Sequence, residues 1–450
     1  MADKKYFGTD GVRGTVGNDP MTADFALKLG SAAAQVIIPD GGKVIIGKDT
    51  RVSGYMFESA LEAGFVAAGA NVLLAGPLPT PGIAFLCQEI KADLGVVISA
   101  SHNLYFDNGI KFFDSSGEKL TDKIELEIER YLDQPAITKE SKKIGHAKIY
   151  NAARERYQEF CVSSFPVERN LEKYKIVFDG ANGAAYKIAP RIFSQLGANV
   201  IPIGCSPNGR NINHNCGSTQ PLLLQQTVVA TKSDIGIAVD GDGDRLLLID
   251  DSGEILDGDQ ILFILAKALK KNGELTGPVV GTNMSNIGLE VALNRENIDF
   301  LRADVGDRNV FEMLKKSGGM IGGEASGHVI CLNKTTTGDG IVTALQVLAV
   351  MEETGKNLSE LYAGMQKYPQ KIINVKVKQN FSPLGSSSLK KLIDQIKNKL
   401  GNDGRVVLRN SGTEPIFRIM VEGKDEETVN NLAKQLESEV RSVSECFFST

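Results

Sequence analysis

Short runs of apolar, mostly β-branched residues recur along the first 300 residues and alternate with longer stretches of helical periodicity. Within the runs, apolar and polar positions rarely alternate, which is typical of strands covered on both faces. The runs lie at residues 42–47, 94–99, 175–179, 235–239 and 278–282. Residues 259–271 show the helical pattern, with apolar positions three and four apart and Gly273 beyond the end. The alternation predicts α/β layers with largely parallel strands.

A faint internal repeat accompanies this pattern. Residues 67–76 and 195–204 each show a helix end, a glycine, and then Ala-Asn-Val opening a strand. A strand that ends in a glycine-rich turn also recurs at 44–49, 176–183 and 279–286. The repeat predicts about three related α/β units.

The last eighty or so residues follow a different pattern. Residues 372–378 and 418–423 alternate apolar and polar positions, as strands with one solvent-facing side do. Residues 427–440 place four apolar side chains on one helical face. We therefore expect a smaller C-terminal α+β domain.

Composition narrows the class of protein. The chain has 450 residues and a net charge of −5, which argues against non-specific binding to nucleic acid or anionic membranes. Its first residues lack the apolar core of a secretory signal, and no apolar run approaches the roughly 18 residues of a spanning helix. Six scattered cysteines without a C-x-x-C pair indicate reduced thiols. We expect a cytoplasmic protein.

Three aspartates separated by glycines interrupt two apolar runs at residues 235–250. Asp240, Asp242 and Asp244 are followed directly by Arg245. Glycine spacers let a loop fold its carboxylates around one point, where a hard divalent cation would offset their repulsion. A solvated acidic turn is the simpler alternative, but the flanking strands and the third aspartate favour a metal site. An EF-hand is excluded because Arg245 and Asp251 stand where that loop needs Gly and Glu.

A second polar loop, SASHN at residues 99–103, follows the predicted strand at 94–99. The carboxyl end of a strand is where α/β proteins place ligands, so Ser101 is a candidate nucleophile or phosphate carrier. No G-x-S-x-G motif surrounds it, which argues against a hydrolase elbow. His102 is a neighbour in sequence, and adjacency alone does not make it a base.

The loop GGEASGH at 322–328 offers an acceptor, a hydroxyl and an imidazole within five residues. Glu324, Ser326 and His328 therefore form a candidate set for recognising hydroxyl groups. Near the N-terminus, Arg13, Lys48 and Arg51 lie in glycine-containing segments that are weak signals by themselves.

The segment RNSGTEP at 409–415, followed by Arg418, has the composition of an anion cradle. Its two arginines carry forked donors, and the hydroxyls and turn amides would complete the set. The candidate residues are Arg409, Asn410, Ser411, Gly412, Thr413 and Arg418. The alternative is an ordinary Ser-Gly turn before a strand, and the flanking arginines favour phosphate.

Taken in order, FGTDGVRG, SASHN, DGDGDR, GEASGH and RNSGTEPIFR resemble the α-D-phosphohexomutases over essentially the whole chain. The segments at 6–14, 107–113, 211–219 and 302–308 resemble most closely the bacterial members that act on glucosamine phosphates. The resemblance implies three related α/β domains with mixed, mainly parallel sheets and a smaller C-terminal α+β domain around a central cleft. We expect the domains at residues 1–150, 151–255, 256–368 and 369–450.

The resemblance also implies a set of roles. Ser101 would carry a phosphate in the active enzyme, and one Mg²⁺ per chain would be bound by Asp240, Asp242, Asp244 and an oxygen of that phosphate. Sugar hydroxyls would meet Glu324 and Ser326, and the non-reacting phosphate would bind the residues of the 409–418 segment. The reaction centre would be lined by Arg13, Lys111, Arg245 and His328.

The implied reaction interconverts glucosamine 6-phosphate and glucosamine 1-phosphate through glucosamine 1,6-bisphosphate, for UDP-N-acetylglucosamine and cell-envelope synthesis. The protein would be a monomer or a homodimer. The main alternative is a phosphomannomutase/phosphoglucomutase of the same fold. A metal-dependent phosphatase and a non-catalytic sugar-phosphate sensor are further alternatives, and the sensor is disfavoured because Ser101 and all three aspartates are present.

Two positions depart from the family pattern. Leu104 follows SASHN where the family usually has Pro, which predicts a more mobile phosphoserine loop. Ala325 stands where the glucosamine-phosphate enzymes usually have Gln. Loss of that amide would relax discrimination at the 2-position of the sugar.

Overall fold

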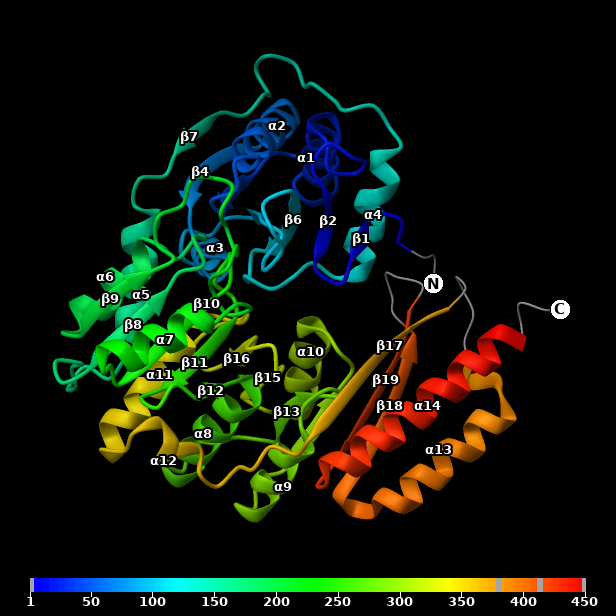
Figure 1. Ribbon diagram of the computed structural model, residues 1–450. Coiled ribbons are helices and arrows are strands. Elements are labelled where there is room, and N and C mark those ends of the chain that lie inside the picture. Colours follow the sequence, from blue (N-terminus) through cyan, green and yellow to red (C-terminus); the bar gives the residue numbers. More distant parts are fainter. Residues whose placement is uncertain (1–3, 378–382, 411–415, 447–450) are drawn as a thin grey trace.

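The computed structural model describes residues 4–377, 383–410 and 416–446, which form four sheets that follow one another along the chain. We refer to the units built on these sheets as domains 1 to 4. Figure 1 shows domain 1 above domain 3, with domain 2 joining them on one side and domain 4 beside domain 3 on the other.

Domain 1 contains a seven-stranded sheet in the order β1-β2-β6-β5-β3-β4-β7. Its parallel part is β5-β3-β4-β7, and β6, β2 and β1 extend the sheet in antiparallel fashion. Its strands are β1 (Phe7–Gly8), β2 (Gly11–Thr15), β3 (Lys43–Lys48), β4 (Asn71–Pro77), β5 (Leu94–Ile98), β6 (Asp107–Asp114) and β7 (Ala147–Ile149). Its helices are α1 (Ala23–Ile37), α2 (Gly54–Ala67), α3 (Thr80–Glu89) and α4 (Asp122–Leu132).

Domains 2 and 3 contain sheets in the orders β12-β11-β10-β8-β9 and β14-β13-β15-β16. Domain 2 comprises α5 (Ala153–Ser164), β8 (Lys175–Asp179), α6 (Ile188–Gln195), β9 (Asn199–Ile203), α7 (Leu222–Thr231), β10 (Ile235–Val239), β11 (Leu246–Asp250) and β12 (Ile255–Leu256). Domain 3 comprises α8 (Gly258–Lys271), β13 (Val279–Thr282), α9 (Ile287–Arg295), β14 (Phe300–Ala303), α10 (Asp307–Ser317), β15 (Ile321–Gly323), β16 (Val329–Cys331), α11 (Gly340–Thr354) and α12 (Leu358–Tyr362).

Domain 4 has an antiparallel three-stranded sheet in the order β17-β19-β18. It comprises β17 (Gln370–Lys376), η1 (Pro383–Gly385), α13 (Ser387–Leu400), η2 (Gly401–Asp403), β18 (Gly404–Asn410), β19 (Ile416–Gly423) and α14 (Glu426–Cys446). Helices α13 and α14 cover one face of the sheet through a cluster that includes Val375, Phe417 and Leu436. The other face carries Arg409 and Arg418 beside a cavity of about 260 Å³.

The first three sheets repeat one four-strand order. The repeated orders are β6-β5-β3-β4, β11-β10-β8-β9 and β16-β15-β13-β14. In each, one helix connects the last two strands of this order: α2 joins β3 to β4, α6 joins β8 to β9, and α9 joins β13 to β14. The residue after the helix C-cap has left-handed backbone: Gly69 (φ 97°), Gly197 (φ 99°) or Asn297 (φ 55°). The next N–H bonds back to the carbonyl five residues earlier, as in a Schellman motif. These repeats confirm the prediction of three related α/β units.

The sequence pattern predicted the positions of these strands and helices correctly. It did not indicate which strands are antiparallel. The runs at 175–179 and 235–239 coincide with β8 and β10, and the helical pattern at 259–271 lies within α8. Strands β6, β11 and β16 nevertheless return antiparallel to their neighbours. Both kinds of strand are apolar and mostly buried, and this holds even for β16 at the edge of its sheet, so the apolar pattern cannot distinguish them.

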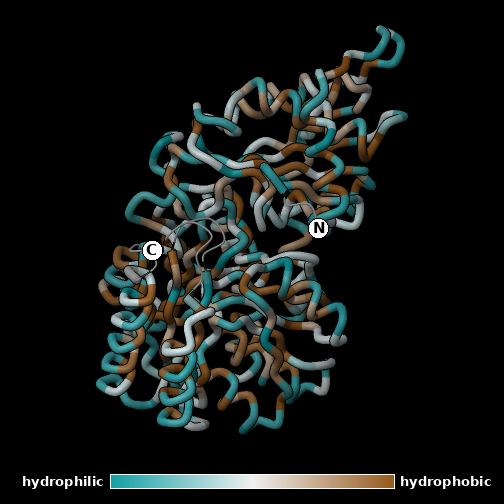
Figure 2. Tube along the Cα trace, turned by 90° about the vertical axis from the view of Figure 1, so that its right-hand side faces the viewer, coloured by the Kyte–Doolittle hydropathy of each residue, from teal (hydrophilic) through white to brown (hydrophobic). Residues whose placement is uncertain are grey.

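Apolar packing joins domains 1, 2 and 3. One cluster of buried side chains runs from Ile83 in α3 through Tyr157 in α5 and Phe178 in β8 to Phe263 in α8. Domain 4 has a separate cluster. In Figure 2 the apolar stretches lie inside the units, and hydrophilic segments form the outer turns. Among the described residues, no helix is both long and apolar enough to cross a bilayer.

The start of α11 connects domain 3 to the aspartate loop of domain 2. Asp339 caps the helix by accepting the N–H groups of Ile341 (3.0 Å) and Val342 (2.9 Å), and it accepts the hydroxyl of Tyr157 from α5 (2.8 Å). The next residue, Gly340, donates its N–H to the carbonyl of Gly243 (2.9 Å). Burial raises the pKa of Asp339 to about 6.

The raised pKa of Asp339 predicts a pH-dependent stability. The folded state disfavours its charged form, so wild-type stability should fall as the pH rises from about 4 to 6. An Asp339→Asn variant does not titrate here, so its unfolding free energy relative to wild type should rise by about 3 kcal/mol between pH 4 and pH 7. Chemical denaturation over this range measures the difference. Tyr157→Phe keeps the carboxyl and removes a hydrogen bond that lowers its pKa, so the pH dependence should be at least as large as in the wild type. A difference for Asp339→Asn that does not change with pH would contradict the prediction.

Candidate active site at the meeting of three hairpin loops

Three loops at equivalent places in the repeated topology carry the residues singled out from the sequence. The loop between β5 and β6 contains Ser101, the loop between β10 and β11 contains the three aspartates, and the loop between β15 and β16 contains residues 324–328. Each loop joins a central strand to its antiparallel neighbour. The repeated fold therefore brings three different chemical groups to corresponding ends of three sheets.

Ser101 is buried and has left-handed backbone, with φ of 53° and 1% of its surface exposed. Its N–H donates to the Ser99 hydroxyl (2.9 Å), and its own hydroxyl donates to Asp240 Oδ2 (2.5 Å). Non-glycine residues seldom adopt this backbone, and the surroundings must stabilise it. The Ser101 hydroxyl is thus fixed against the aspartate loop.

Two side chains far away in sequence hold the Ser101 loop by its carbonyl groups. Arg51 Nη2 donates to the carbonyls of Ser101 (3.2 Å) and Asn103 (2.5 Å). Asn213 Nδ2 of domain 2 donates to the same two carbonyls (2.8 and 2.9 Å). Arg51 is fully buried and pairs with Asp49. From the sequence, Arg51 was only a weak candidate and Asn213 had no predicted role. Both contacts join residues far apart in the chain, so local residue spacing does not indicate them.

The three aspartates form one compact group of carboxylates. One oxygen from each lies within 4.8 Å of the others, and all three side chains are buried. Burial, together with repulsion from Asp242 and Asp244, raises the pKa of Asp240 well above its ordinary value. Among the residues that the structure describes, Asp242 Oδ1 and Asp244 Oδ1 have no hydrogen-bond partner. This oxygen-rich, partly unsatisfied donor set fits a hard divalent cation.

Lys111 of β6 balances part of this negative charge. Its Nζ lies 2.8 Å from Asp242 Oδ2, 3.3 Å from Asp244 Oδ2 and 3.0 Å from Asp10 Oδ2. Burial alone would lower the pKa of Lys111, but the neighbouring carboxylates raise it well above its ordinary value. Lys111 is therefore charged.

Two arginines complete the positive side of the site. Arg13 of β2 pairs with Asp10 from the same N-terminal segment. The backbone N–H of Arg245 donates to Asp240 Oδ1 (3.2 Å), and Arg245 lies within electrostatic reach of Asp240, Asp244 and Glu324. The structure therefore brings Arg13, Lys111 and Arg245 together around the aspartate loop.

His328 lies between two carboxylates. Its Nδ1 is 3.7 Å from Asp244 Oδ1 and its Nε2 is 3.6 Å from Asp307 Oδ2. Burial would lower the pKa of His328, but Asp244 and Asp307 raise it above its ordinary value. Because Nε2 accepts the N–H of Gly338 (3.2 Å), the neutral ring in this arrangement carries its proton on Nδ1, facing Asp244.

His102 has different surroundings. Its Nδ1 is 3.4 Å from the Ser101 hydroxyl. Burial and the charges of Arg245 and Arg13 lower the pKa of His102 to about 4. His102 is therefore neutral near pH 7, and its ring is too weakly basic to hold a proton there.

The sugar-recognition candidates lie on the side of domain 3. Glu324 is half-buried, and its Oε1 accepts the N–H of Gly306 (3.0 Å), whereas Ser326 is exposed on the same loop. The carbonyl of Ala325 accepts the N–H of Gly258 at the start of α8 (3.2 Å), which fixes the loop against domain 3.

The phosphate-binding candidates lie on domain 4. Arg409 and Arg418 face each other in the register of β18 and β19, and Arg409 is within electrostatic reach of Glu324 across the domain boundary. Asn410 is the exposed last residue of β18. Ser411, Gly412 and Thr413 lie outside the described residues.

Several residues of the site had no role in the sequence interpretation. Asp10 links Lys111, Lys119 and Arg13. The Thr80 hydroxyl donates to Asp242 Oδ2 (2.6 Å) from the start of α3. The position of Asp10 inside the FGTDGVRG motif was the one feature of the sequence that could have indicated its role. No feature of the sequence indicated a role for Thr80.

Comparison with known proteins identifies the class. Profiles described as phosphoglucomutase/phosphomannomutase alpha/beta/alpha domains I, II and III match residues 4–138, 155–253 and 257–368, and the profile of the C-terminal domain matches residues 372–439. The chain belongs to the phosphoglucomutase/phosphomannomutase family.

Within the family, similar curated relatives carry one name. The chain is 54% identical over 440 residues to "Phosphoglucosamine mutase" of Marinomonas sp., covering 98% of each chain. It is 52% identical over 445 residues to "Phosphoglucosamine mutase 1" of Shewanella amazonensis, covering 99% of this chain and 100% of that one.

Solved structures share the fold at lower identity. A phosphoglucomutase/phosphomannomutase family protein from Burkholderia thailandensis matches with a TM-score of 0.79 and 24% identity, covering 97% of each chain. The Aspergillus fumigatus N-acetylphosphoglucosamine mutase, solved with GlcNAc-6P and magnesium, matches with a TM-score of 0.71 and 15% identity, covering 98% of this chain and 96% of that one.

The buried aspartate group predicts a stability that depends on divalent metal. A cation that binds only the folded protein should stabilise it by about 2.7 kcal/mol at a hundred times its dissociation constant. We expect Mg²⁺ to raise the melting temperature of the wild type and to leave that of Asp240→Asn unchanged. The Asp251→Asn variant alters an exposed carboxylate one residue beyond β11 and should retain the wild-type response. An equal response in Asp240→Asn and the wild type would contradict the assignment.

Proposed function

We propose that this protein is a mutase that interconverts glucosamine 6-phosphate and glucosamine 1-phosphate. The observation that carries the chemistry is the Ser101 hydroxyl held 2.5 Å from Asp240, inside a buried group of carboxylates. The sugar is suggested by the relatives named phosphoglucosamine mutase, which match over almost the whole chain. The product would feed synthesis of UDP-N-acetylglucosamine and the cell envelope.

Ser101 is the proposed phosphate carrier. Its phosphoryl group passes to the free hydroxyl of the substrate, so that the bond from Ser101 Oγ to phosphorus breaks and a sugar oxygen–phosphorus bond forms. The resulting glucosamine 1,6-bisphosphate turns within the site and returns its other phosphoryl group to Ser101. The released product has exchanged one phosphorylated position for the other, and the enzyme is again phosphorylated.

The aspartate loop would hold the cofactor. Asp240, Asp242 and Asp244, together with an oxygen of the Ser101 phosphate, would bind one Mg²⁺. The ion would neutralise charge on the phosphoryl group that is transferred. Two carboxylate oxygens that accept no hydrogen bond from the described part of the chain, together with the raised pKa of Asp240, support a cation at this position.

The remaining candidates surround this centre. Arg13 and Arg245 would stabilise phosphoryl oxygens, and Lys111 and His328 would exchange protons with the sugar hydroxyls. The three carboxylates around Lys111 support its entering the reaction in the charged form.

Two further groups would hold the substrate. Glu324 and Ser326 would accept and donate hydrogen bonds to sugar hydroxyls. The phosphate that does not react would bind Arg409, Asn410, Ser411, Gly412, Thr413 and Arg418. The electrostatic proximity of Arg409 to Glu324 supports a substrate that spans both groups.

The proposal extends to the organisation and setting of the protein. We divide the chain into domains at residues 1–150, 151–255, 256–368 and 369–450. We further propose a cytoplasmic monomer or homodimer. The family description leaves a second candidate function, phosphomannomutase/phosphoglucomutase activity, because Ala325 in the 322–328 loop would relax discrimination at the 2-position of the sugar.

The proposal predicts a phosphoserine that sugar bisphosphate can restore. Intact mass of the purified protein incubated with glucosamine 1,6-bisphosphate should show one added phosphoryl group. Ser101→Ala should lack it and lose mutase activity, whereas Ser115→Ala, at an exposed turn of the same domain, should keep both. Absence of phosphate under every priming condition would contradict the carrier role.

The proposal also predicts which sugar phosphate the enzyme prefers. Comparison of kcat/KM for glucosamine, mannose and glucose phosphates should favour glucosamine, with little release of free phosphate. A strong preference for mannose or glucose phosphate would select the second candidate instead, and steady phosphate release would indicate a phosphatase.

A further inference from the structure

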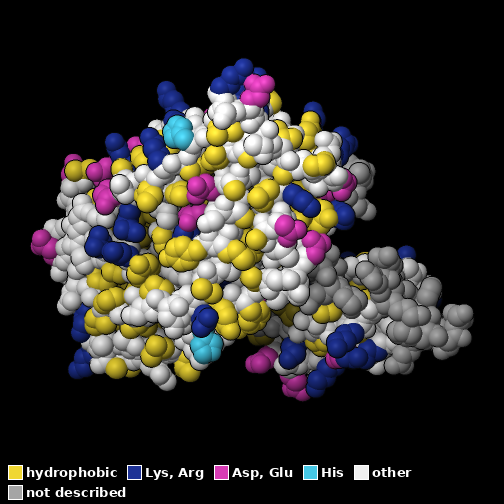
Figure 3. Space-filling model, turned by 90° about the horizontal axis from the view of Figure 1, so that it is seen from above, with side chains coloured by type: hydrophobic (Ala, Val, Ile, Leu, Met, Phe, Trp, Pro, Cys, Tyr) yellow, Lys and Arg dark blue, Asp and Glu magenta, His cyan; other side chains and the backbone are white. Residues whose placement is uncertain are grey.

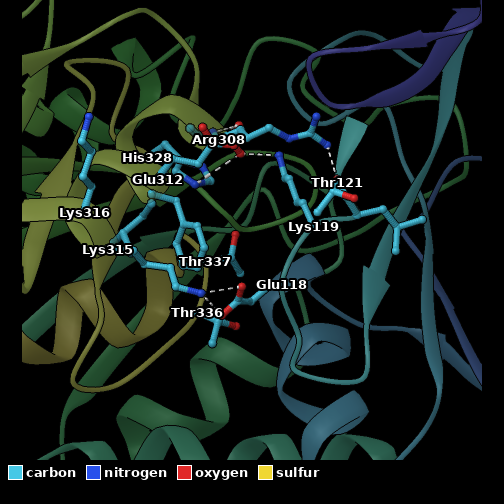
Figure 4. Close-up of a pocket in the computed structure, with 14 residues that line it drawn as sticks. Glu118, Lys119, Thr121, Arg308, Glu312, Lys315, Lys316, His328, Thr336 and Thr337 are labelled. Carbon is cyan, nitrogen blue, oxygen red and sulfur yellow. Dashed lines mark hydrogen bonds and ion pairs between the residues drawn. The ribbon is translucent and has the colours of Figure 1, made fainter. Parts of the chain in front are cut away.

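The end of the connection between β14 and α10, with the first two residues of α10, contacts three parts of the molecule at once. This segment comprises residues 305–308 and is called the bridging turn below. The sequence motif at 302–308 contains it, and none of its residues has a role in the proposed function. It lies at a cavity of about 420 Å³ between domains 1 and 3, which is also lined by Lys119 and His328 (Figure 4).

Gly306 orients the sugar loop. Its N–H donates to Glu324 Oε1 (3.0 Å), so one carboxylate oxygen of the sugar-recognition candidate is already held. The φ of Gly306 is 125°, which side-chain-bearing residues rarely adopt. The turn therefore needs glycine in order to aim this donor.

Asp307 connects the sugar loop to domain 1. Its Oδ2 is 3.6 Å from His328 Nε2 and pairs with Lys119 Nζ, which follows β6 in domain 1. Lys119 in turn lies 2.5 Å from Asp10 Oδ1, and Asp10 Oδ2 lies 3.0 Å from Lys111 Nζ. Figure 4 shows Lys119 and His328 approaching each other across the cavity. Basic and acidic side chains therefore alternate from His328 to Lys111 through Asp307, Lys119 and Asp10.

Arg308 fixes the bridging turn to domain 1. Its guanidinium donates to Glu125 Oε1 (2.7 Å) and to the carbonyl of Leu120 (2.6 Å), and it pairs with Asp122. Glu125 is buried, so this ion pair is poorly screened and restricts the position of the turn.

A nearby ion pair between domains 1 and 3 does not contact the loop that carries Glu324 and His328. Lys315, two turns further along α10, pairs with Glu118 of domain 1 at 2.9 Å. Its side chain is 54% exposed, and pairs of this kind contribute little to stability. It joins the same two domains without touching the sugar loop, which makes it a matched control.

We propose that the bridging turn is a positioning element, in which Asp307 and Gly306 align His328 and Glu324 of domain 3 with the phosphoryl-transfer centre of domains 1 and 2. The inference rests on the proposed function. The sugar is held from domain 3, while Ser101 and the aspartate loop belong to the other two domains. A hydroxyl can reach the phosphoryl group in line only if these domains keep a fixed register, and a displacement of about 1 Å can cost a hundredfold in rate.

The test separates positioning from general stability. Asp307→Asn keeps the shape of the side chain and removes its charge, so kcat should fall by about ten- to a hundredfold while KM changes little. Lys315→Ala should keep the wild-type kcat, and neither variant should greatly change the melting temperature. Arg308→Lys, a milder change that keeps a cation, should lower kcat to a smaller extent.

A double-mutant cycle tests the charge connection. Because Asp307 and Lys119 act through each other, Asp307→Asn combined with Lys119→Met should lose less activity than the product of the two single losses. The exposed pair Lys315 and Glu118, replaced by alanine singly and together, should show no such coupling. A wild-type kcat in Asp307→Asn, or an equal loss in Lys315→Ala, would overturn the inference. Failure of the proposed function would appear instead in the wild type, as absence of mutase activity on glucosamine phosphates.

Discussion

The concentration of negative charge at Asp240, Asp242 and Asp244 is the constraint on which the rest of the site depends. Carboxylates this close and this buried repel one another unless opposite charges surround them. The surrounding charges come from separate parts of the chain: Lys111 from β6, Arg13 from β2 and Arg245 from the loop itself. The site therefore exists only when domain 1 is docked onto domain 2, which the shared apolar core enforces.

The repeated topology explains how one chain gathers three kinds of chemistry. A strand and its antiparallel return recur in domains 1, 2 and 3, and each connecting loop carries a different function-bearing group. Loops can diverge while the sheets beneath them keep their packing. On the face seen in Figure 3, basic and acidic side chains are interspersed, as expected for a chain with net charge −5. Several buried charged side chains, among them Lys111, Asp240, Asp242 and Asp244, gather inside the site.

The sequence predicted the elements and the principal chemical groups, because both depend on local pattern. Ser101 and Asp240 each follow an apolar run that forms a central strand, so their position at a strand end was readable. The contacts that hold Ser101 and Asp240 in place could not be predicted from the sequence. Arg51 reaches the Ser101 carbonyl from 50 residues away, and Asn213 reaches it from 112 residues away. No periodicity records such a pairing, and Asp307, which contacts Lys119 across 188 residues, was missed for the same reason.

These long-range donors also bear on Leu104. A proline after SASHN would restrict the backbone of Asn103, and its absence predicted a looser loop. Here the carbonyl of Asn103 accepts hydrogen bonds from Arg51 (2.5 Å) and Asn213 (2.9 Å), which restrict the same residue by other means. The prediction of greater mobility stays open, and these two contacts argue against it.

The attachment of domain 4 would suit the proposed reaction, in which either phosphate of the substrate would have to be held in turn. It has its own apolar cluster, and its contacts with domain 3 are polar: Arg405 donates to the carbonyl of Asn283 (2.9 Å), and Glu422 accepts the N–H of Ile287 (3.0 Å). Arg405 and Glu422 face each other at one end of the β18–β19 pair, whereas Arg409 and Arg418 face each other four residues further along. Four residues of antiparallel strand span about 14 Å. A small rotation about the anchored end would therefore move the arginines through a larger arc, while the apolar cluster shared by domains 1, 2 and 3 would stay intact.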